Sequence, residues 1–216
     1  CSVRRQRQMC IRDRNEGDSG DKVNLDSDYV ATLSDTTITA TVLNAVDGNV
    51  PGTVNASTVA TITGAAADIK TAYASSGLSG LGDEAVTITD TGSVAASDLN
   101  TINSATTGLV TATSVATLTG TAAAINTLVG NEGDSGDKGN LDSDYVATLT
   151  DTTITATVLN AVDGNVPGTV NASTVATITG ALADINTAYA SSGFSGLGDE
   201  AVTITDTGSV AASVLN

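Results

Sequence analysis

The sequence contains no histidine and no tryptophan, a single phenylalanine and only two cysteines. Without histidine, the Ser-His-Asp and Cys-His nucleophile systems are excluded, together with the commonest zinc ligand. Both cysteines, Cys1 and Cys10, lie in the first fourteen residues, so the rest of the chain has neither a disulfide framework nor a thiol metal site. These absences favour a protein that is not an enzyme.

Basic residues are also scarce, and five of the eight are arginines within residues 1–14. From residue 15 onwards there are three lysines against 23 acidic side chains. Such a surface repels phosphate backbones and anionic lipids, which argues against nucleic-acid binding and makes divalent cations the natural counter-ions. No run approaches the about 20 apolar residues needed to cross a bilayer, so no membrane span is expected.

Residues 1–14, CSVRRQRQMCIRDR, differ in composition from everything that follows and have no counterpart in the rest of the chain. They lack the apolar segment of a secretory signal. The string resembles a translated sequencing-adapter peptide. We therefore expect a non-native or disordered leader, and the alternative is a genuine basic arm.

The remainder is a tandem repeat, because residues 15–100 recur as residues 131–216 with an offset of 116. Of the 86 aligned positions, six differ: Val23/Gly139, Ser34/Thr150, Ala66/Leu182, Lys70/Asn186, Leu78/Phe194 and Asp98/Val214. The chain thus divides into a first repeat, 15–130, and a second repeat, 131–216, that is truncated within its unit. This organisation predicts a fragment of a longer array.

A shorter period lies inside the long one, marked by a strand-like T-[IL]-[TS] motif. Its central residues are Leu33, Ile62, Ile88, Leu118, Leu149, Ile178 and Ile204. Four units of about 29 residues make up the 116, a length typical of solenoids. The strand centres should point inward.

An amphipathic segment follows each motif and predicts a short helix. In GAAADIKTAYASSG, the face contains Ala65, Ala66, Ile69, Ala72 and Tyr73. In DTTITATVLNAVDGN, Asp35, Thr36 or Thr37 is the expected cap, and the face is formed by Ile38, Val42, Ala45 and Val46.

Strands that alternate with short helices imply a parallel sheet with right-handed crossovers. The sequence therefore predicts an α/β solenoid of stacked strand-helix coils, about 29 residues each, with four coils in the first repeat. The alternative is an all-β array, either an immunoglobulin-like sandwich or a β-solenoid, because TVNASTVATITG at 53–64 is long enough for two strands.

An acidic linker, NEGDSGDKVNLDSDY at 15–29, recurs at 131–145 and is the candidate metal site. Calcium prefers six to eight oxygen ligands, and glycine lets backbone carbonyls contribute. The candidate calcium ligands are Asp18, Asp21, Asp26, Asp28, Asp134, Asp137, Asp142 and Asp144. The spacing matches neither the EF-hand nor the calcium nonapeptide, and the alternative is a solvated turn whose polar side chains satisfy the backbone.

Threonines flank the strand centres and form a second candidate site. If coils stack, they should form two rows on one sheet face, with strands about 4.8 Å apart. The predicted rows contain Thr32, Thr61, Thr63, Thr87, Thr89, Thr117, Thr119, Thr148 and Thr150. Such rows resemble the ice-binding face of some antifreeze β-solenoids; the alternative is that threonine simply suits a solvent-facing strand.

The recurring LGDE, at 81–84 and 197–200, places two carboxylates side by side. General acid catalysis needs a carboxyl group with a raised pKa in a cleft, and the sequence supplies no apolar pocket. We therefore interpret LGDE as a turn before the strand AVTITD.

The phrases TVNASTVATITG, ADINTAYASSG and LVTATSVATLTG resemble repeats of very large surface and extracellular proteins of marine bacteria and cyanobacteria. The resemblance covers residues 15–216 and carries no catalytic residue. It implies an adhesin-like protein of cell-surface layers, with calcium binding or motility in some members.

These observations predict a non-enzymatic, extended structural or adhesive segment of a secreted or cell-surface protein. Its expected partners are neighbouring repeats of the same parent chain and cell-surface or matrix components. The alternatives are a calcium- or glycan-binding module and, more distantly, an ice-binding threonine surface.

Overall fold

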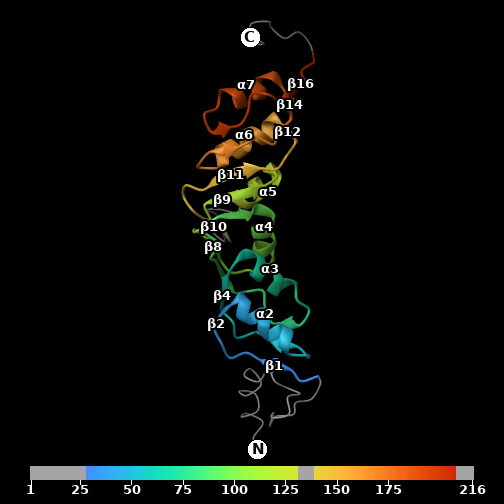
Figure 1. Ribbon diagram of the computed structural model, residues 1–216, viewed down its shortest axis with the longest axis vertical. Coiled ribbons are helices and arrows are strands. Elements are labelled where there is room, and N and C mark those ends of the chain that lie inside the picture. The colour runs from blue at the N-terminus through green and yellow to red at the C-terminus, as the bar shows by residue number, and fades with distance from the viewer. Residues whose placement is uncertain (1–27, 131–138, 208–216) are drawn as a thin grey trace, which may run out of the picture. The chain divides into compact units, whose positions relative to one another are not determined.

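Helices and parallel strands alternate along the chain in the computed structural model, which describes residues 28–130 and 139–207 (Figure 1). The helices are α2 (Ala40–Asn49), α3 (Ala66–Ala74), α4 (Ala96–Ala105), α5 (Ala122–Val129), α6 (Ala156–Asn165) and α7 (Leu182–Ala190). The α/β prediction is confirmed, and the all-β alternative is wrong because the Ala-rich segments are helical.

The strands are short, two to four residues each. They are β1 (Ala31–Thr32), β2 (Thr37–Thr39), β3 (Val54–Asn55), β4 (Thr61–Gly64), β5 (Leu78–Ser79), β6 (Ala85–Ile88), β7 (Ser93–Ala95), β8 (Val110–Ala112), β9 (Thr117–Gly120), β10 (Gly139–Leu141), β11 (Val146–Leu149), β12 (Thr153–Thr155), β13 (Val170–Asn171), β14 (Thr177–Gly180), β15 (Phe194–Ser195) and β16 (Ala201–Ile204).

The described chain forms two compact units. Unit 1 contains residues 28–89 and 101–111, and unit 2 contains residues 90–100, 112–130 and 139–207, so the division passes through α4.

Each unit contains two parallel sheets. In unit 1, β2, β4, β6 and β8 lie side by side in that order, and β1, β3 and β5 form the other sheet. In unit 2, one sheet has the order β7-β9-β11-β13-β15 and the other β12-β14-β16. Helices α2 and α3 of unit 1 each connect a strand of one sheet to a strand of the other, as do α6 and α7 of unit 2.

The strand register corrects the predicted coil. Thr37 pairs with Thr61, and Thr61 with Ala85, so the step from one strand to its neighbour is equal in both pairs and shorter than the predicted period. The prediction of a single strand in each coil is also wrong. Each described helix has a short strand before it and a second short strand after it. The step is not constant along the chain, because Thr117 of β9 pairs with Val146 of β11, a step that equals the predicted period.

The predicted strand centres form the core, which confirms their inward orientation. Leu33, Ile62, Ile88, Leu118, Leu149 and Ile178 are all at most 2% exposed. Burial of each such side chain contributes about 1.5–3 kcal/mol relative to exposure. Ile204 is the exception, at 37% exposed.

The start of α2 differs from the prediction. Thr37–Thr39 is strand β2, and the helix begins at Ala40 with the Thr39 hydroxyl accepting the Val42 N–H at 3.4 Å. The β-branched run Thr-Ile-Thr pairs with the matching run at 61–63, and this pairing outweighs an earlier helix start. Val42, predicted to be in the core, is 51% exposed. For α3 the predicted face is confirmed, because Ala66, Ile69 and Ala72 are buried.

Polar side chains connect each coil to the next. The Asn44 amide donates from α2 to the carbonyl of Asp68 in α3 at 2.9 Å, and the identical pair in unit 2 repeats this bond. At the start of α5, the Ala122 N–H donates at 2.8 Å to Asp151, which lies in the following coil. A helix end left without a partner is costly when buried, and the Asp151 carboxylate satisfies one such N–H at the start of α5.

Candidate functional site

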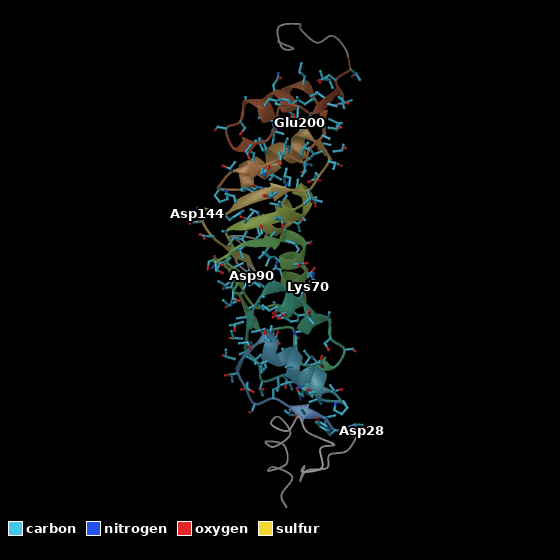
Figure 2. All side chains as sticks on the ribbon, viewed as in Figure 1. Asp28, Lys70, Asp90, Asp144 and Glu200 are labelled. Atoms are coloured by element: carbon cyan, nitrogen blue, oxygen red, sulfur yellow. The ribbon has the colours of Figure 1, made fainter. Side chains whose placement is uncertain are left out.

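Three of the candidate calcium ligands lie in the described part of the acidic linker. Asp28 and Asp144 (Figure 2) are exposed. Asp142 is partly exposed. In residues 28–130 and 139–207, no group of three or more His, Cys, Asp or Glu side chains could hold a metal ion. The other candidate ligands, Asp18, Asp21, Asp26, Asp134 and Asp137, lie outside the described residues. Calcium binding therefore stays a prediction from the sequence.

Threonines do form rows, on the outer face of the sheet that contains β2, β4, β6 and β8. The hydrogen-bonded register places Thr39, Thr63, Thr87 and Thr111 next to one another in one row. A second row contains Thr37 and Thr61, followed by Ala85. In unit 2, the sheet β12-β14-β16 repeats the first row with Thr155, Thr179 and Thr203.

These rows differ from the predicted ones. Thr32 belongs to the other sheet of unit 1, where it pairs with Asn55. Thr89 and Thr150 each follow the last residue of a strand. The prediction missed Thr37, Thr39 and Thr111. The Thr-Ile-Thr sequence at 37–39 recurs at 61–63, the segment with which it pairs, and this recurrence could have revealed Thr37 and Thr39.

The side chains of both rows are uncharged, and those of the first row are all threonines. Thr39 and Thr87 are exposed, whereas Thr63 and Thr111 are partly exposed. Within the part of the chain that the structure describes, the hydroxyls of Thr63, Thr87 and Thr111 make no hydrogen bond. Neighbouring strands lie about 4.8 Å apart and alternate residues of one strand about 6.6 Å apart, so hydroxyl and methyl groups form a regular two-dimensional array.

The LGDE segment precedes β6, as predicted, but Glu84 is completely buried. Both of its carboxylate oxygens accept the Gly82 N–H at 2.9 Å, and one accepts the Tyr73 hydroxyl from α3 at 3.0 Å. The Thr106 hydroxyl donates to the Glu84 carbonyl at 2.6 Å. The glutamate therefore holds its own loop against α3, and Asp83 beside it remains exposed.

The second copy of this loop has the same internal bonds in a different setting. Glu200 accepts the Tyr189 hydroxyl at 2.8 Å and the Gly198 N–H at 2.9 Å. However, Glu200 is only partly buried, in the loop before β16 (Figure 2), and Tyr189 is 41% exposed. The bonds are thus a property of the local sequence, whereas the burial of Glu84 depends on a segment further along the chain.

Tyrosine titration should make the protein sensitive to alkali. Burial, reinforced by the Glu84 carboxylate, raises the pKa of Tyr73 far above its ordinary value, and burial together with Glu200 raises the pKa of Tyr189 to about 12. A raised pKa in the folded state gives stability that is complete below about pH 10, where tyrosine of the unfolded chain titrates, and is lost as the pH rises through the folded pKa.

We therefore expect the free energy of unfolding in urea to fall steadily above about pH 10. Tyr73→Phe should flatten this alkaline decline, because no phenolate can then form beside Glu84. An unchanged pH profile in the Tyr73→Phe protein would contradict the assignment.

Each of the four tyrosines donates its hydroxyl to an acceptor within the protein: Tyr29, Tyr73, Tyr145 and Tyr189. Their polar ends therefore serve internal packing. No helix in the described ranges is long and apolar enough to cross a membrane. The chain matches no family model, no curated protein and no solved structure.

Proposed function

We propose that the chain is a non-enzymatic structural and adhesive repeat segment of a secreted or cell-surface protein, built as a solenoid of stacked α/β coils. The single observation that carries the proposal is the coil-to-coil register, in which Thr37 pairs with Thr61 and Thr61 with Ala85, all in parallel. Successive coils that bury one another's apolar faces extend a protein by simple repetition.

The polar contacts support the same proposal. The Asn44 amide and the Asp151 carboxylate both bond backbone groups of a neighbouring coil. A coil whose backbone is completed by its neighbour gains stability from being in an array. The function proposed for such an array is mechanical, and no single side chain performs it.

The surface chemistry suits contact with large, hydrated partners. The net charge of −16 would keep the array soluble and repel nucleic acids and anionic lipids. The threonine rows are uncharged and occur in both units. A repeated surface can bind a partner through many weak and identical contacts. The partners that fit this arrangement best are cell-surface or matrix components.

Proteins with one, two and three complete copies of the 15–130 repeat would test the solenoid. We expect the urea midpoint to rise with each added repeat and the maximum dimension measured by small-angle X-ray scattering to grow linearly, because each repeat adds interfaces as well as length. A midpoint and dimension that do not change with repeat number would overturn the proposal.

The threonine register favours ice binding as a second candidate function. The four threonines of the Thr39–Thr111 row lie in adjacent strands, and three of their hydroxyls make no bond in the described protein. A regular array of hydroxyl and methyl groups, free of charge, can order water into a lattice that matches ice.

Thermal hysteresis of the purified chain would test ice binding. Thr87→Leu, in the middle of the row, should abolish most of the hysteresis. Thr71→Leu, on the exposed side of α3, is the matched control and should leave it unchanged. The absence of hysteresis in the unmodified chain would remove this candidate.

A further inference from the structure

The sequence Asn-Ala-Ser occurs twice, at residues 55–57 and 171–173, and takes no part in the functions proposed above. Asn-X-Ser or Asn-X-Thr, in which X is not proline, is the acceptor sequence of N-linked glycosylation. No other asparagine in the sequence is followed two positions later by serine or threonine. Because so short a pattern also arises by chance, its surroundings in the fold decide whether the side chain can accept a sugar.

Asn55 lies where the chain leaves a sheet. It is the last residue of β3, and it pairs with Thr32 of β1 on one side and with Ser79 of β5 on the other. Asn55 is exposed, whereas the next residue, Ala56, is 0% exposed. Since side chains alternate between the faces of a strand, the asparagine points outward, between two small uncharged neighbours that leave room for a sugar.

The carboxamide of Asn55 is held at its oxygen end. Its Oδ1 atom accepts the Ser57 N–H at 3.0 Å, which closes an Asx turn. Among the residues that the structure describes, neither the Asn55 Nδ2 atom nor the Ser57 hydroxyl has a hydrogen-bond partner. The nitrogen that would carry the sugar and the hydroxyl that defines the acceptor sequence are therefore both available.

The turn that follows Asn55 rests on the next coil. The Ala56 N–H donates to the Ser79 carbonyl at 2.8 Å. Gly80 passes so close that a Cβ atom added to it would lie 2.8 Å from the Cβ of Ser57. A sugar on Asn55 would therefore be attached to an ordered part of the surface.

The second copy has the same geometry. Asn171 ends β13 and pairs with Thr148 on one side and with Ser195 on the other. Its Oδ1 atom accepts the Ser173 N–H at 3.0 Å. Asn171 is partly exposed and Ser173 is exposed. The acceptor sequence thus occupies the same outward position in each unit.

We propose that Asn55 and Asn171 are N-glycosylation sites, each of which takes one oligosaccharide from a lipid-linked pyrophosphate donor. In the transfer, the Nδ2 atom forms a bond to the anomeric carbon of the sugar and loses one proton. The bond from that carbon to the pyrophosphate breaks, and the pyrophosphate leaves with the electron pair.

The glycans would occupy one side of the solenoid and leave the threonine rows open. Asn55 and Asn171 lie in the sheets that contain β3 and β13, whereas the rows lie in the sheets that contain β4 and β14. An array would carry one bulky, hydrated glycan in each repeat, beside its uncharged threonine face. The inference rests on the secretion assumed in the proposed function and adds a modification to it.

Secretion of the chain from yeast cells behind a cleavable signal peptide would test the proposal. The intact mass is measured before and after treatment with peptide N-glycosidase F, and we expect two glycans, both removed by the enzyme. Ser57→Ala retains Asn55 but destroys its acceptor sequence, so one glycan should remain. Ser57→Thr is the conservative variant and should keep both.

The matched control places an acceptor sequence at a buried asparagine. Ala105→Thr turns residues 103–105 into Asn-Ser-Thr, and Asn103 is 7% exposed. The folded, secreted Ala105→Thr protein should therefore carry no third glycan. The glycans on Asn55 and Asn171 should leave the urea midpoint at the value of the enzymatically deglycosylated protein, because they project from the surface.

The proposal is overturned by a mass that the glycosidase does not change, by two glycans on the Ser57→Ala protein, or by a third glycan on folded Ala105→Thr protein. A urea midpoint that is lower with the glycans than without them would also overturn it. The added signal peptide makes the test independent of the natural location of the chain. If stability grows with repeat number while the chain stays unmodified, the modification alone is excluded and the solenoid stands.

Discussion

Replacing Glu84 with alanine is expected to lower the free energy of unfolding by about 3 kcal/mol, whereas Glu200→Ala should cost about 1 kcal/mol or less. The two glutamates make the same local bonds, so the difference isolates burial. Without Glu84, which is completely buried, the part-buried Gly82 N–H and Tyr73 hydroxyl lose their acceptor. Each unsatisfied buried donor costs about 1–3 kcal/mol.

Urea unfolding followed by circular dichroism would measure both losses, and hydrogen exchange at Gly82 and Gly198 would assign them to the two loops. Tyr73→Phe should be milder than Glu84→Ala, because it removes one donor and leaves the acceptor bonded to Gly82. Equal losses for the two alanine variants would show that burial of Glu84 contributes nothing.

The inward face of each strand could be predicted from the sequence, but the register could not. The motif alignment matched Ile88 with Ile62, whereas in the structure Ile62 pairs with Val86, two positions before Ile88. A slip of two positions returns a strand to the same face, since side chains alternate with a period of two. Ile62, Val86 and Ile88 are therefore all buried, and hydrophobicity alone cannot choose between the two alignments.

The first turn of α2 shows the limit of local helix signals. Asp35, Thr36 and Thr37 are good capping residues, and the apolar spacing beyond them suits a helix. Residues 37–39 form a strand instead of a first helical turn, because the identical Thr-Ile-Thr run at 61–63 provides a backbone pairing partner for each of them. Non-local pairing is invisible to a short sequence window, which is why Thr39 was not recognised as the cap.

Glu84 was interpreted as part of a turn before the strand AVTITD because the sequence supplies no apolar pocket around it. Its partners come from elsewhere: Tyr73 lies in the preceding helix, and Thr106 lies beyond the following one. The repeat did contain a clue, since the Tyr-to-Glu spacing is the same at Tyr189 and Glu200. The difference in burial, however, could only come from the structure.

Gly108→Ala in the intact chain is expected to destabilise unit 1 by about 1–3 kcal/mol. The new methyl group would meet the carbonyl oxygen of Glu84, and backbone cannot move aside as a flexible side chain would. Relief requires the 105–111 segment to shift from β6, which weakens the Thr106 and Thr107 bonds and exposes Val86. Amide exchange at Val86 should then approach the rate at its exposed counterpart, Val202.

The matched control is Gly48→Ala, at the end of α2, where a Cβ would meet nothing within 4 Å. Alanine there should stabilise the protein by about 0.5–1 kcal/mol, because it restricts the unfolded chain and favours the helix. Opposite signs at two glycines of one unit separate a steric requirement from a general effect of alanine. If both substitutions stabilise, Gly108 is not held against Glu84, and the burial of Glu84 cannot be explained by this contact.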